Sequence, residues 1–412
     1  VDNAAAIINK ALEHCRKTGA SKLVIPRGTY KSFDGTQIIV QDFEDFTIDG
    51  QGSTIIINKN LRKSGPSTLS IARCKRTLLE NLNFDWDWNS NPLASVVEVV
   101  GGNDKYFDIK FLEYEDFPQK DVRIGIFSAY DPKTKSVGIE NGKTLAFNMF
   151  VGRGKPVETQ WIASNILRIK TKNPFEAGEL YRLQHSYYEY GCVSMLSNTH
   201  LTLRNFNIYS CSGHAFTVSG TQKYWHFDNV NIVRPPNSER RAITTTADHL
   251  HIAQSQGYMK MENCEFSLGA DDCINMHDCS IIMDRESDET LLSVNARNSY
   301  LYNEGEEIEL RQDDFSPAGF TGKVIEKTLV DKERKIYRVR LDKPIPEMKG
   351  VYFVLFSKKY DTRNMIVRNC YFHDNRARGV LILARDVTVE NCRFFHNEMG
   401  AIKIETGFTG NS

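Results

Sequence analysis

The feature that most constrains the fold of this chain is a short motif that occurs six times. Each copy alternates apolar with polar residues and ends in Asn-x-x-Phe or Asn-x-x-Ile. Alternation with a period of two, together with β-branched and aromatic residues, predicts a short strand in each copy. Asparagine tolerates left-handed backbone and bonds to nearby backbone groups, so we expect it where each strand turns. The six asparagines are Asn81, Asn205, Asn229, Asn263, Asn369 and Asn391.

The spacing of this motif predicts a solenoid. Asn205 and Asn229 are 24 residues apart, and Asn369 and Asn391 are 22 residues apart. A unit of this length is one coil of a parallel β-helix, in which each coil stacks on the one before it. A β-sandwich with similar strands would instead place them about 8–12 residues apart, joined by hairpin turns. We therefore predict an all-β fold, a right-handed parallel β-helix with its asparagines stacked in a ladder.

Two longer intervals locate insertions. Asn81 to Asn205 spans 124 residues and Asn263 to Asn369 spans 106, so each holds one coil and roughly 80 to 100 additional residues. Both insertions contain apolar strands separated by polar turns, which predicts small antiparallel β-barrel-like domains. A helix over 4–19, with helical apolar spacing and a closing glycine, is expected to cap the open end of the solenoid. The predicted division is a catalytic β-helix over 1–90, 185–279 and 362–412, with inserted domains at 91–184 and 280–361.

The composition argues against several classes of partner. Lys and Arg total 52 and Asp and Glu total 52, so the formal net charge is zero. Nucleic-acid binders and membrane-surface binders usually carry a basic excess, and no apolar run approaches the roughly 18 residues of a membrane-spanning helix. We therefore expect neither a nucleic-acid partner nor a membrane span. The chain begins at Val1 rather than methionine, so we expect a removed targeting segment and a secreted, periplasmic or cell-surface protein.

The nine cysteines do not suggest a disulfide framework or a metal site. Cys264, Cys370 and Cys392 each follow the asparagine of a motif, which predicts stacked interior positions where free cysteine acts as a small hydrophobe. There is no CxxC pair, and the grouping of Cys273 with His277 lacks the second cluster that a zinc site needs. We expect the protein to use no metal and no cofactor.

Three aspartates are spaced by one coil. Asp248 precedes Asp271 by 23 residues and Asp272 by 24. Residues one coil apart stack about 4.8 Å from each other, so we expect the three carboxylates to meet on one face of the solenoid. Like charges so close raise at least one pKa, which allows a protonated acid to stand beside an ionised base. The alternative is a solvated face held together by salt bridges.

Counting from the asparagine ladder adds neighbours to this cluster. His214, Asp272 and Arg378 each lie nine residues after a motif asparagine. His214 and Asp248 also lie at matching positions, because each stands 15 residues before a motif asparagine. His214, Arg376 and Arg378 are therefore predicted to line the same side of successive coils and to contact substrate. A mixed column of ionisable residues suggests a site, because stability alone favours an apolar ladder.

Aromatic and polar residues before and after the first insertion could recognise a sugar. Trp88 follows the first motif, and Tyr187 and Tyr188 precede the second. Their rings suit the apolar faces of sugars, although most tryptophans pack in the core. Arg182 and His185 lie on the same approach and are predicted to form hydrogen bonds to sugar hydroxyls.

Several segments resemble known families. The opening DNAAAIINKALEHC, followed by KLVIPRGTY, resembles the first coil of the pectate-lyase-like β-helix superfamily. ADHLHI, GADDCINMHD, RARGVLILARDVTVENCRFF and GAIKIETG resemble glycoside hydrolase family 110, which comprises exo-acting inverting α-galactosidases, including α-1,3-galactosidases. The resemblance covers nearly the whole chain. Asn275, His277 and Glu405 lie in these segments and are candidate substrate contacts.

The resemblance implies Asp248, Asp271 and Asp272 as the catalytic acids. Polygalacturonases of the same superfamily also use an Asp followed one coil later by Asp-Asp. By that similarity Asp271 is the general acid while Asp248 and Asp272 activate water, although these roles can be exchanged. Inversion ordinarily places acid and base about 6.5–9.5 Å apart. The family pattern continues with further coils where this chain ends at TGNS, so we expect a truncated C-terminus.

We predict that the protein removes terminal α-linked galactose, with α-1,3 linkage, from glycans or polysaccharides. One alternative is a β-helix polysaccharide lyase, with Arg376 or Arg378 as base, or a polygalacturonase-like hydrolase of uronate polymers. Another is a β-helix that binds glycans without catalysis. Association into a homo-oligomer through the insertions is compatible with each of these.

Overall fold

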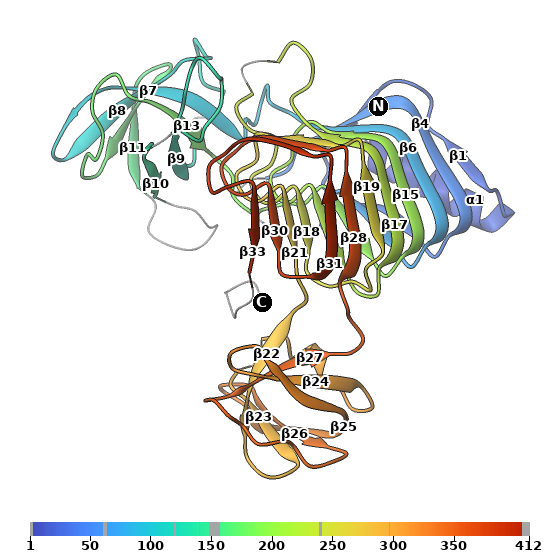
Figure 1. The fold of residues 1–412 in the computed structure, drawn as a ribbon. Helices are drawn as coiled ribbons and strands as arrows, with labels where there is room; N and C mark the ends of the chain where they lie inside the picture. The colour runs from blue at the N-terminus through green and yellow to red at the C-terminus, as the bar shows by residue number, and fades with distance from the viewer. Residues whose placement is uncertain are drawn as a thin grey trace.

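Two long parallel sheets form the centre of the protein. The computed structural model describes residues 3–60, 64–118, 121–139, 141–147, 157–238, 241–295 and 297–405. Figure 1 shows the strands of both sheets stacked coil upon coil, with one antiparallel unit at the side of the last coils and another below them. The predicted all-β fold with a parallel β-helix is confirmed.

The larger sheet has twelve strands, and the second sheet has eight. The main path of the larger sheet is β1 (Lys22–Val24), β4 (Glu44–Ile57), β6 (Lys75–Trp86), β15 (Thr199–Ile208), β17 (Lys223–Ile232), β19 (Met259–Glu262), β28 (Arg363–Arg368) and β31 (Arg385–Glu390); its further strands are β2 (Thr29–Ser32), β20 (Glu265–Ser267), β29 (Tyr371–Asn375) and β32 (Arg393–Asn397). The second sheet is β3 (Ile38–Gln41), β5 (Leu69–Ala72), β14 (Val193–Leu196), β16 (Phe216–Ser219), β18 (Leu250–Ile252), β21 (Ile274–Met276), β30 (Val380–Ile382) and β33 (Ile402–Ile404).

The motif asparagines form the corner of the coils, as predicted. All six have φ between 48° and 58°, the left-handed region that asparagine tolerates better than other side chains. Their amides also bond from coil to coil: Asn205 Nδ2 donates to Asn81 Oδ1 at 3.1 Å, and Asn229 Nδ2 donates to Asn205 Oδ1 at 2.9 Å. The same residue type therefore permits the turn and links successive turns.

The interior of the coils is apolar. Inward positions of neighbouring strands stack, as Phe84 does on Phe206 at 5.5 Å between ring centroids. Cys264 and Cys370 are buried there and Cys392 is half-buried, and all nine cysteines of the chain are free thiols. Stacked side chains of one type fill a solenoid core because each coil repeats the geometry of the last.

Helix α1 (Ala4–Thr18) covers the first coil. Its apolar face, which includes Ile8 and Leu12, is buried in the same core as the strands. Gly19, at φ 70°, ends the helix in the left-handed conformation that suits glycine. The expected capping helix is confirmed, and it shields the edge of the first strands.

Two antiparallel units interrupt the coils. A seven-stranded sheet has the order β10 (Thr144–Ala146), β9 (Ile126–Ala129), β13 (Leu180–Gln184), β7 (Ala94–Asn103), β8 (Tyr106–Phe111), β12 (Ile166–Lys170) and β11 (Glu158–Ala163). A closed barrel has the order β22 (Ser280–Arg285), β23 (Thr290–Ser293), β26 (Ile336–Leu341), β25 (Pro317–Asp331), β24 (Glu307–Gln312) and β27 (Phe353–Ser357), with a short 3-10 helix η1 (Ser299–Leu301). Each unit has its own apolar cluster. The domain boundaries drawn from the sequence stay predictions.

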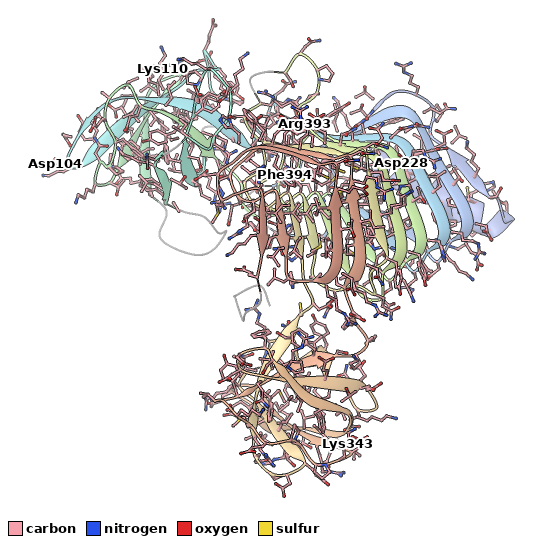
Figure 2. All side chains as sticks on the ribbon, in the orientation of Figure 1. Asp104, Lys110, Asp228, Lys343, Arg393 and Phe394 are labelled. Carbon is pink, nitrogen blue, oxygen red and sulfur yellow. The ribbon has the colours of Figure 1, made fainter. Side chains whose placement is uncertain are left out.

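Charged side chains of both signs are spread over the surface of all three parts. Figure 2 shows Asp104 and Lys110 on the seven-stranded sheet, Asp228 on the coils and Lys343 on the barrel. Within the described ranges, no helix combines the length and the apolar character that crossing a bilayer requires.

Candidate active site

A column of ionisable residues precedes four consecutive strands of the eight-stranded sheet. His214, Asp248, Asp272 and Arg378 each lie two residues before β16, β18, β21 and β30, respectively. The strands pair in register, Phe216 with Leu250, Leu250 with Ile274 and Ile274 with Val380. The four side chains therefore occupy the same position in successive coils, which is the arrangement that the counting from the asparagines predicted.

The three aspartates meet at this column. One oxygen from each of Asp248, Asp271 and Asp272 lies within 4.8 Å of the other two. The backbone N–H of Asp272 donates to Oδ1 of Asp248 at 3.1 Å. Arg378 donates to Oδ1 of Asp272 from its backbone N–H at 3.0 Å and from Nη1 at 3.1 Å. Backbone and guanidinium donors thus fix two of the three carboxylates in place.

Asp271 has different hydrogen-bond partners from the other two aspartates, and its side chain is more exposed to solvent. Its side chain is 18% exposed, whereas those of Asp248 and Asp272 are each 3% exposed. The hydroxyl of Tyr188 donates to Oδ2 of Asp271 at 2.6 Å, and Nη2 of Arg376 lies 3.5 Å from Oδ1. The backbone of Tyr188 has φ 57°, a strained conformation for an aromatic residue that is often found at functional sites.

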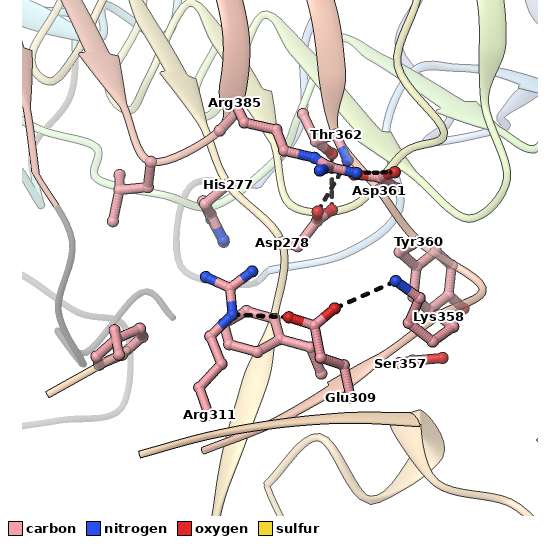
Figure 3. A pocket seen from close by; sticks show the side chains of 14 residues that line it. His277, Asp278, Glu309, Arg311, Ser357, Lys358, Tyr360, Asp361, Thr362 and Arg385 are labelled. Atoms are coloured by element: carbon pink, nitrogen blue, oxygen red, sulfur yellow. Dashed lines mark hydrogen bonds and ion pairs between the residues drawn. The ribbon is translucent and has the colours of Figure 1, made fainter. Parts of the chain in front are cut away.

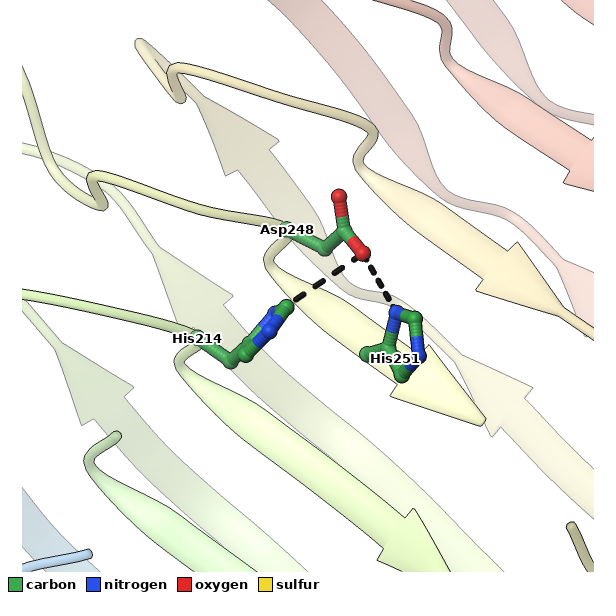
Figure 4. Close-up of side chains that lie close together, drawn as sticks. All are labelled: His214, Asp248 and His251. Atoms are coloured by element: carbon green, nitrogen blue, oxygen red, sulfur yellow. Dashed lines mark hydrogen bonds and ion pairs between the residues drawn. The ribbon is translucent and has the colours of Figure 1, made fainter. Parts of the chain in front are cut away.

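Two histidines flank Asp248. Nδ1 of His251 lies 2.6 Å from Oδ2 of Asp248, and Nδ1 of His214 lies 3.7 Å from the same oxygen (Figure 4). Burial acts to raise the pKa of Asp248, but the hydrogen bond and charge of His251 outweigh it, so the pKa is lowered. Burial likewise acts to lower the pKa of His251, and Asp248 reverses this, so the pKa of His251 is raised. Asp248 and His251 form a buried pair in which each group favours the charged form of the other.

The other two carboxylates shift in the opposite direction. Burial, and then the negative charge of Asp248, raises the pKa of Asp271. Burial and the charges of both other aspartates raise the pKa of Asp272 to about 7. The cluster therefore holds an ionised carboxylate beside two carboxylates whose pKa values are raised, which is the combination that general acid–base chemistry requires.

A row of rings forms one wall of the cluster. The ring centroids of Tyr188 and His214 are 4.9 Å apart, those of His214 and His251 are 4.9 Å apart, and those of His251 and His277 are 5.2 Å apart. Burial lowers the pKa of His214 and of His277 to about 4. His214, Asp248 and His251 have atoms close enough to hold a metal ion, as do the three aspartates.

The chain is similar over almost all of its length to proteins named alpha-1,3-galactosidases. No family model matches the chain. Alpha-1,3-galactosidase A of Shewanella woodyi is 24% identical over 98% of this chain and 70% of its own length. Alpha-1,3-galactosidase B of Bacteroides thetaiotaomicron is 23% identical over 98% of this chain and 69% of its own length. By name, both relatives are glycosidases. The resemblance to glycoside hydrolase family 110 is thereby confirmed, and so is the prediction that the protein is a glycoside hydrolase.

A structural comparison adds little to this assignment. The solved structure of the Streptococcus pneumoniae surface protein and adhesin PfbA aligns with 98% of this chain and 96% of its own, at 10% identity and a TM-score of 0.27. A score that low carries no argument about the fold of this chain.

Several residues predicted to bind substrate in this glycoside hydrolase lie away from the aspartates. Trp88 is buried in the coil core, where its Nε1 donates to Oγ of Ser210 at 2.8 Å, so its predicted place in a sugar-stacking wall is wrong. His185 is buried against phenylalanines of the seven-stranded sheet and bonds to Oγ of Ser95 at 2.9 Å. Neither position could be predicted, because a single sequence does not show which of these side chains are buried.

The remaining candidates have mixed positions. Arg182 is fully buried on β13. Burial lowers the pKa of its guanidinium, and the positive charge of Arg376 lowers it further. Asn275 is buried and pairs in register with His251, so it lies at the site. Glu405 is ion-paired with Lys403 at 2.6 Å.

Sequence reasoning missed two residues that contact the aspartates directly. His251 lies three residues after Asp248, and the alternation within ADHLHI could have placed it on the outward face of the strand. Tyr188 was considered for stacking, but its hydroxyl donates to Asp271 instead. No periodicity predicts that contact, because the two residues are 83 positions apart.

Proposed function

We propose that this protein is an exo-acting, inverting glycoside hydrolase that removes terminal galactose in α-1,3 linkage. The observation that carries the proposal is the cluster of three carboxylates from consecutive coils, in which Asp248 is ionised and the pKa values of Asp271 and Asp272 are raised. The names of the relatives, all alpha-1,3-galactosidases, support galactose as the sugar.

Asp271 suits the role of general acid. It is the most exposed of the three carboxylates, so a glycosidic oxygen can reach it. Its raised pKa favours the protonated form, and in the proposed step the proton passes to the leaving oxygen as the bond to the anomeric carbon breaks. Tyr188 and Arg376 hold the carboxyl group in one orientation during this transfer.

Asp248 suits the role of general base. His251 keeps it ionised, and Asp272 lies beside it in the same cluster. A water hydrogen-bonded at about 2.8 Å to each of two carboxylate oxygens can bridge a gap of the size seen here. In the proposed step this water attacks the anomeric carbon and its proton passes to Asp248.

The spacing of the carboxylates does not by itself favour inversion. Their nearest oxygens lie within 4.8 Å, which is shorter than the about 6.5–9.5 Å common between acid and base in inverting enzymes. The proposal of inversion rests instead on the presence of a third carboxylate, because two can hold the water while one donates the proton.

The test is a screen for released sugar. The protein is incubated with α-linked galactosides and, separately, with uronate polymers, and monosaccharide release is quantified. Asp248→Asn, Asp271→Asn and Asp272→Asn should each lower galactose release by about 100-fold or more. Asp228→Asn, which removes a carboxylate paired with Arg204 on the outside of the coils, is the matched control and should keep full activity.

Two results would contradict the proposal. Calcium-dependent formation of an unsaturated product that absorbs in the ultraviolet would indicate a lyase. Tight glycan binding with no turnover by the wild-type protein would indicate a binding module.

A further inference from the structure

The loop that carries Tyr188 joins the seven-stranded sheet to the coils. This segment, residues 185–192, is called the tyrosine loop; it follows β13 and leads into β14. Tyr188 is its point of contact with the aspartates, since its hydroxyl donates to Oδ2 of Asp271 at 2.6 Å. The backbone of Tyr188 has φ 57°, which an aromatic residue adopts only where its surroundings enforce it. Other contacts of the loop must therefore hold Tyr188 in this conformation.

A buried ion pair lies directly after Tyr188 in the loop. Glu189 is 4% exposed, and its Oε1 accepts a hydrogen bond from Nη1 of Arg123. Its other oxygen, Oε2, accepts hydrogen bonds from the hydroxyl of Ser186 and from the backbone N–H of Tyr187. The carboxylate thus ties the loop to itself through one oxygen and to Arg123 through the other. A buried carboxylate is costly unless it is paired and hydrogen-bonded, so this network fixes the conformation of the loop.

Arg123 belongs to the seven-stranded unit and lies three residues before β9. Its backbone is fixed beside β13, because its carbonyl oxygen lies 2.9 Å from Nδ1 of His185. The backbone N–H of Gly125 donates to the carbonyl oxygen of Gln184 at 3.0 Å, which adds a second anchor. The guanidinium therefore reaches Glu189 from a segment that the insertion itself holds in place.

The coils hold the other side of the tyrosine loop. The backbone N–H groups of Glu189 and Tyr190 donate to the carbonyl oxygen of Ser212, at 2.9 and 3.2 Å. Gly213 allows this close approach, because a Cβ at that position would lie 2.7 Å from the carbonyl carbon of Tyr190. The loop is thus held between the backbone of the coils and the side chain of Arg123.

We propose that Arg123 and Glu189 are positioning residues for the general acid. Their ion pair sets the tyrosine loop so that the hydroxyl of Tyr188 bonds to Asp271. The seven-stranded unit then takes part in catalysis, because it supplies Arg123. This inference rests on the proposed function, in which Asp271 is the acid that protonates the leaving oxygen.

The test is a double-variant cycle between Arg123→Gln and Tyr188→Phe. Each single variant should lower kcat/KM for a galactose α-1,3-linked disaccharide by about 10-fold, because each loses the same hydrogen bond to the acid. If Arg123 acts through Tyr188, the double variant should also lose about 10-fold, whereas independent losses would multiply to about 100-fold. The basic limb of kcat/KM against pH should move upward by about 1 pH unit in all three variants, because the lost hydrogen bond lowers the pKa of Asp271.

Two further variants are controls. Arg168→Gln breaks another arginine–carboxylate pair of the same seven-stranded sheet, in which Nε of Arg168 lies 2.8 Å from Oδ1 of Asp108, and it should change neither kcat/KM nor its pH profile. Arg123→Lys keeps a cation that can reach one oxygen of Glu189, so kcat/KM should stay within about threefold of the wild type. The inference is overturned if the two losses multiply, if Arg123→Gln leaves the pH profile unchanged, or if Arg123→Lys loses as much as Arg123→Gln.

Hydrogen exchange separates this inference from the proposed function. The backbone N–H groups of Tyr187, Glu189 and Tyr190 are all hydrogen-bonded, so their exchange, followed by mass spectrometry, reports on the loop without substrate. Exchange should be about 10-fold faster or more in Arg123→Gln and in Glu189→Gln, which replaces Arg123→Gln in the cycle if that variant does not fold. A wild-type protein that releases no galactose would refute the proposed function, and faster exchange would then still support Arg123 as the residue that holds the loop. Unchanged exchange would refute the inference whether or not galactose is released.

Discussion

The pairing of Asp248 with His251 leads to a quantitative prediction about pH. Nδ1 of His251 lies 2.6 Å from Oδ2 of Asp248, and both groups are largely withdrawn from solvent. A hydrogen bond between charged groups contributes about 1.5–3 kcal/mol, and one pKa unit corresponds to about 1.4 kcal/mol. His251→Gln, which removes the positive charge, should therefore raise the pKa of Asp248 by about 1–2 units.

The consequence for activity follows from the proposed role of Asp248 as base. Asp248 must be ionised to accept a proton, so activity falls as the pH drops through its pKa. The acidic limb of kcat/KM against pH should thus move upward by about 1–2 pH units in His251→Gln. The assay is galactose release measured between pH 4 and pH 9. His226→Gln is the matched control, because His226 pairs with Glu262 at 3.2 Å on the outside of the coils.

One result would refute this reasoning. If kcat/KM of His251→Gln fell by the same factor at every pH, with the acidic midpoint unchanged, His251 would not govern the ionisation of Asp248. An unchanged profile would mean that the pair has no part in the reaction.

Three further predictions concern other parts of the protein. Tyr188→Phe removes a hydrogen bond that lowers the pKa of Asp271, so the basic limb of kcat/KM should shift upward by about 1 pH unit. Burial lowers the pKa of His185 from 6.5 to about 4, so its neutral form stabilises the fold above pH 6.5 and this stability is lost as the pH falls toward 4. The difference in unfolding free energy between pH 7 and pH 4, measured by urea titration, should decrease by about 3 kcal/mol in His185→Phe. Asn205→Ala should lower the free energy of unfolding by about 2 kcal/mol, since alanine is strained in the left-handed region and makes no ladder bond, and Asn205→Gly should cost less.

The repeat made the solenoid and the aspartate cluster predictable. A fixed coil length converts sequence separation into position, so Asp248 and Asp272, 24 residues apart, had to be neighbours. The same counting correctly aligned His214 and Arg378 with them. Asparagine at each corner was predictable because few other residues accept that backbone conformation.

Other parts of the site depended on contacts that periodicity does not encode. The loop carrying Tyr188 follows the seven-stranded sheet, so the coil count does not apply to it. Trp88 was predicted to stack on a sugar, because its distance after the first motif does not tell whether its ring turns toward the core or away from it. Arg311 of the barrel and His277 of the coils line the same cavity (Figure 3). The coil period cannot predict this, because it does not tell which coil an inserted domain packs against.

The measurement that tests the central claim most directly is the configuration of the first sugar released. Proton NMR during cleavage of a galactose α-1,3-linked disaccharide distinguishes the α and β anomers of free galactose before they equilibrate. Inverting hydrolysis at the aspartate cluster predicts β-galactose as the first product, and predicts that Asp271→Asn abolishes its formation. Release of α-galactose, or unchanged release by Asp271→Asn, would contradict the account.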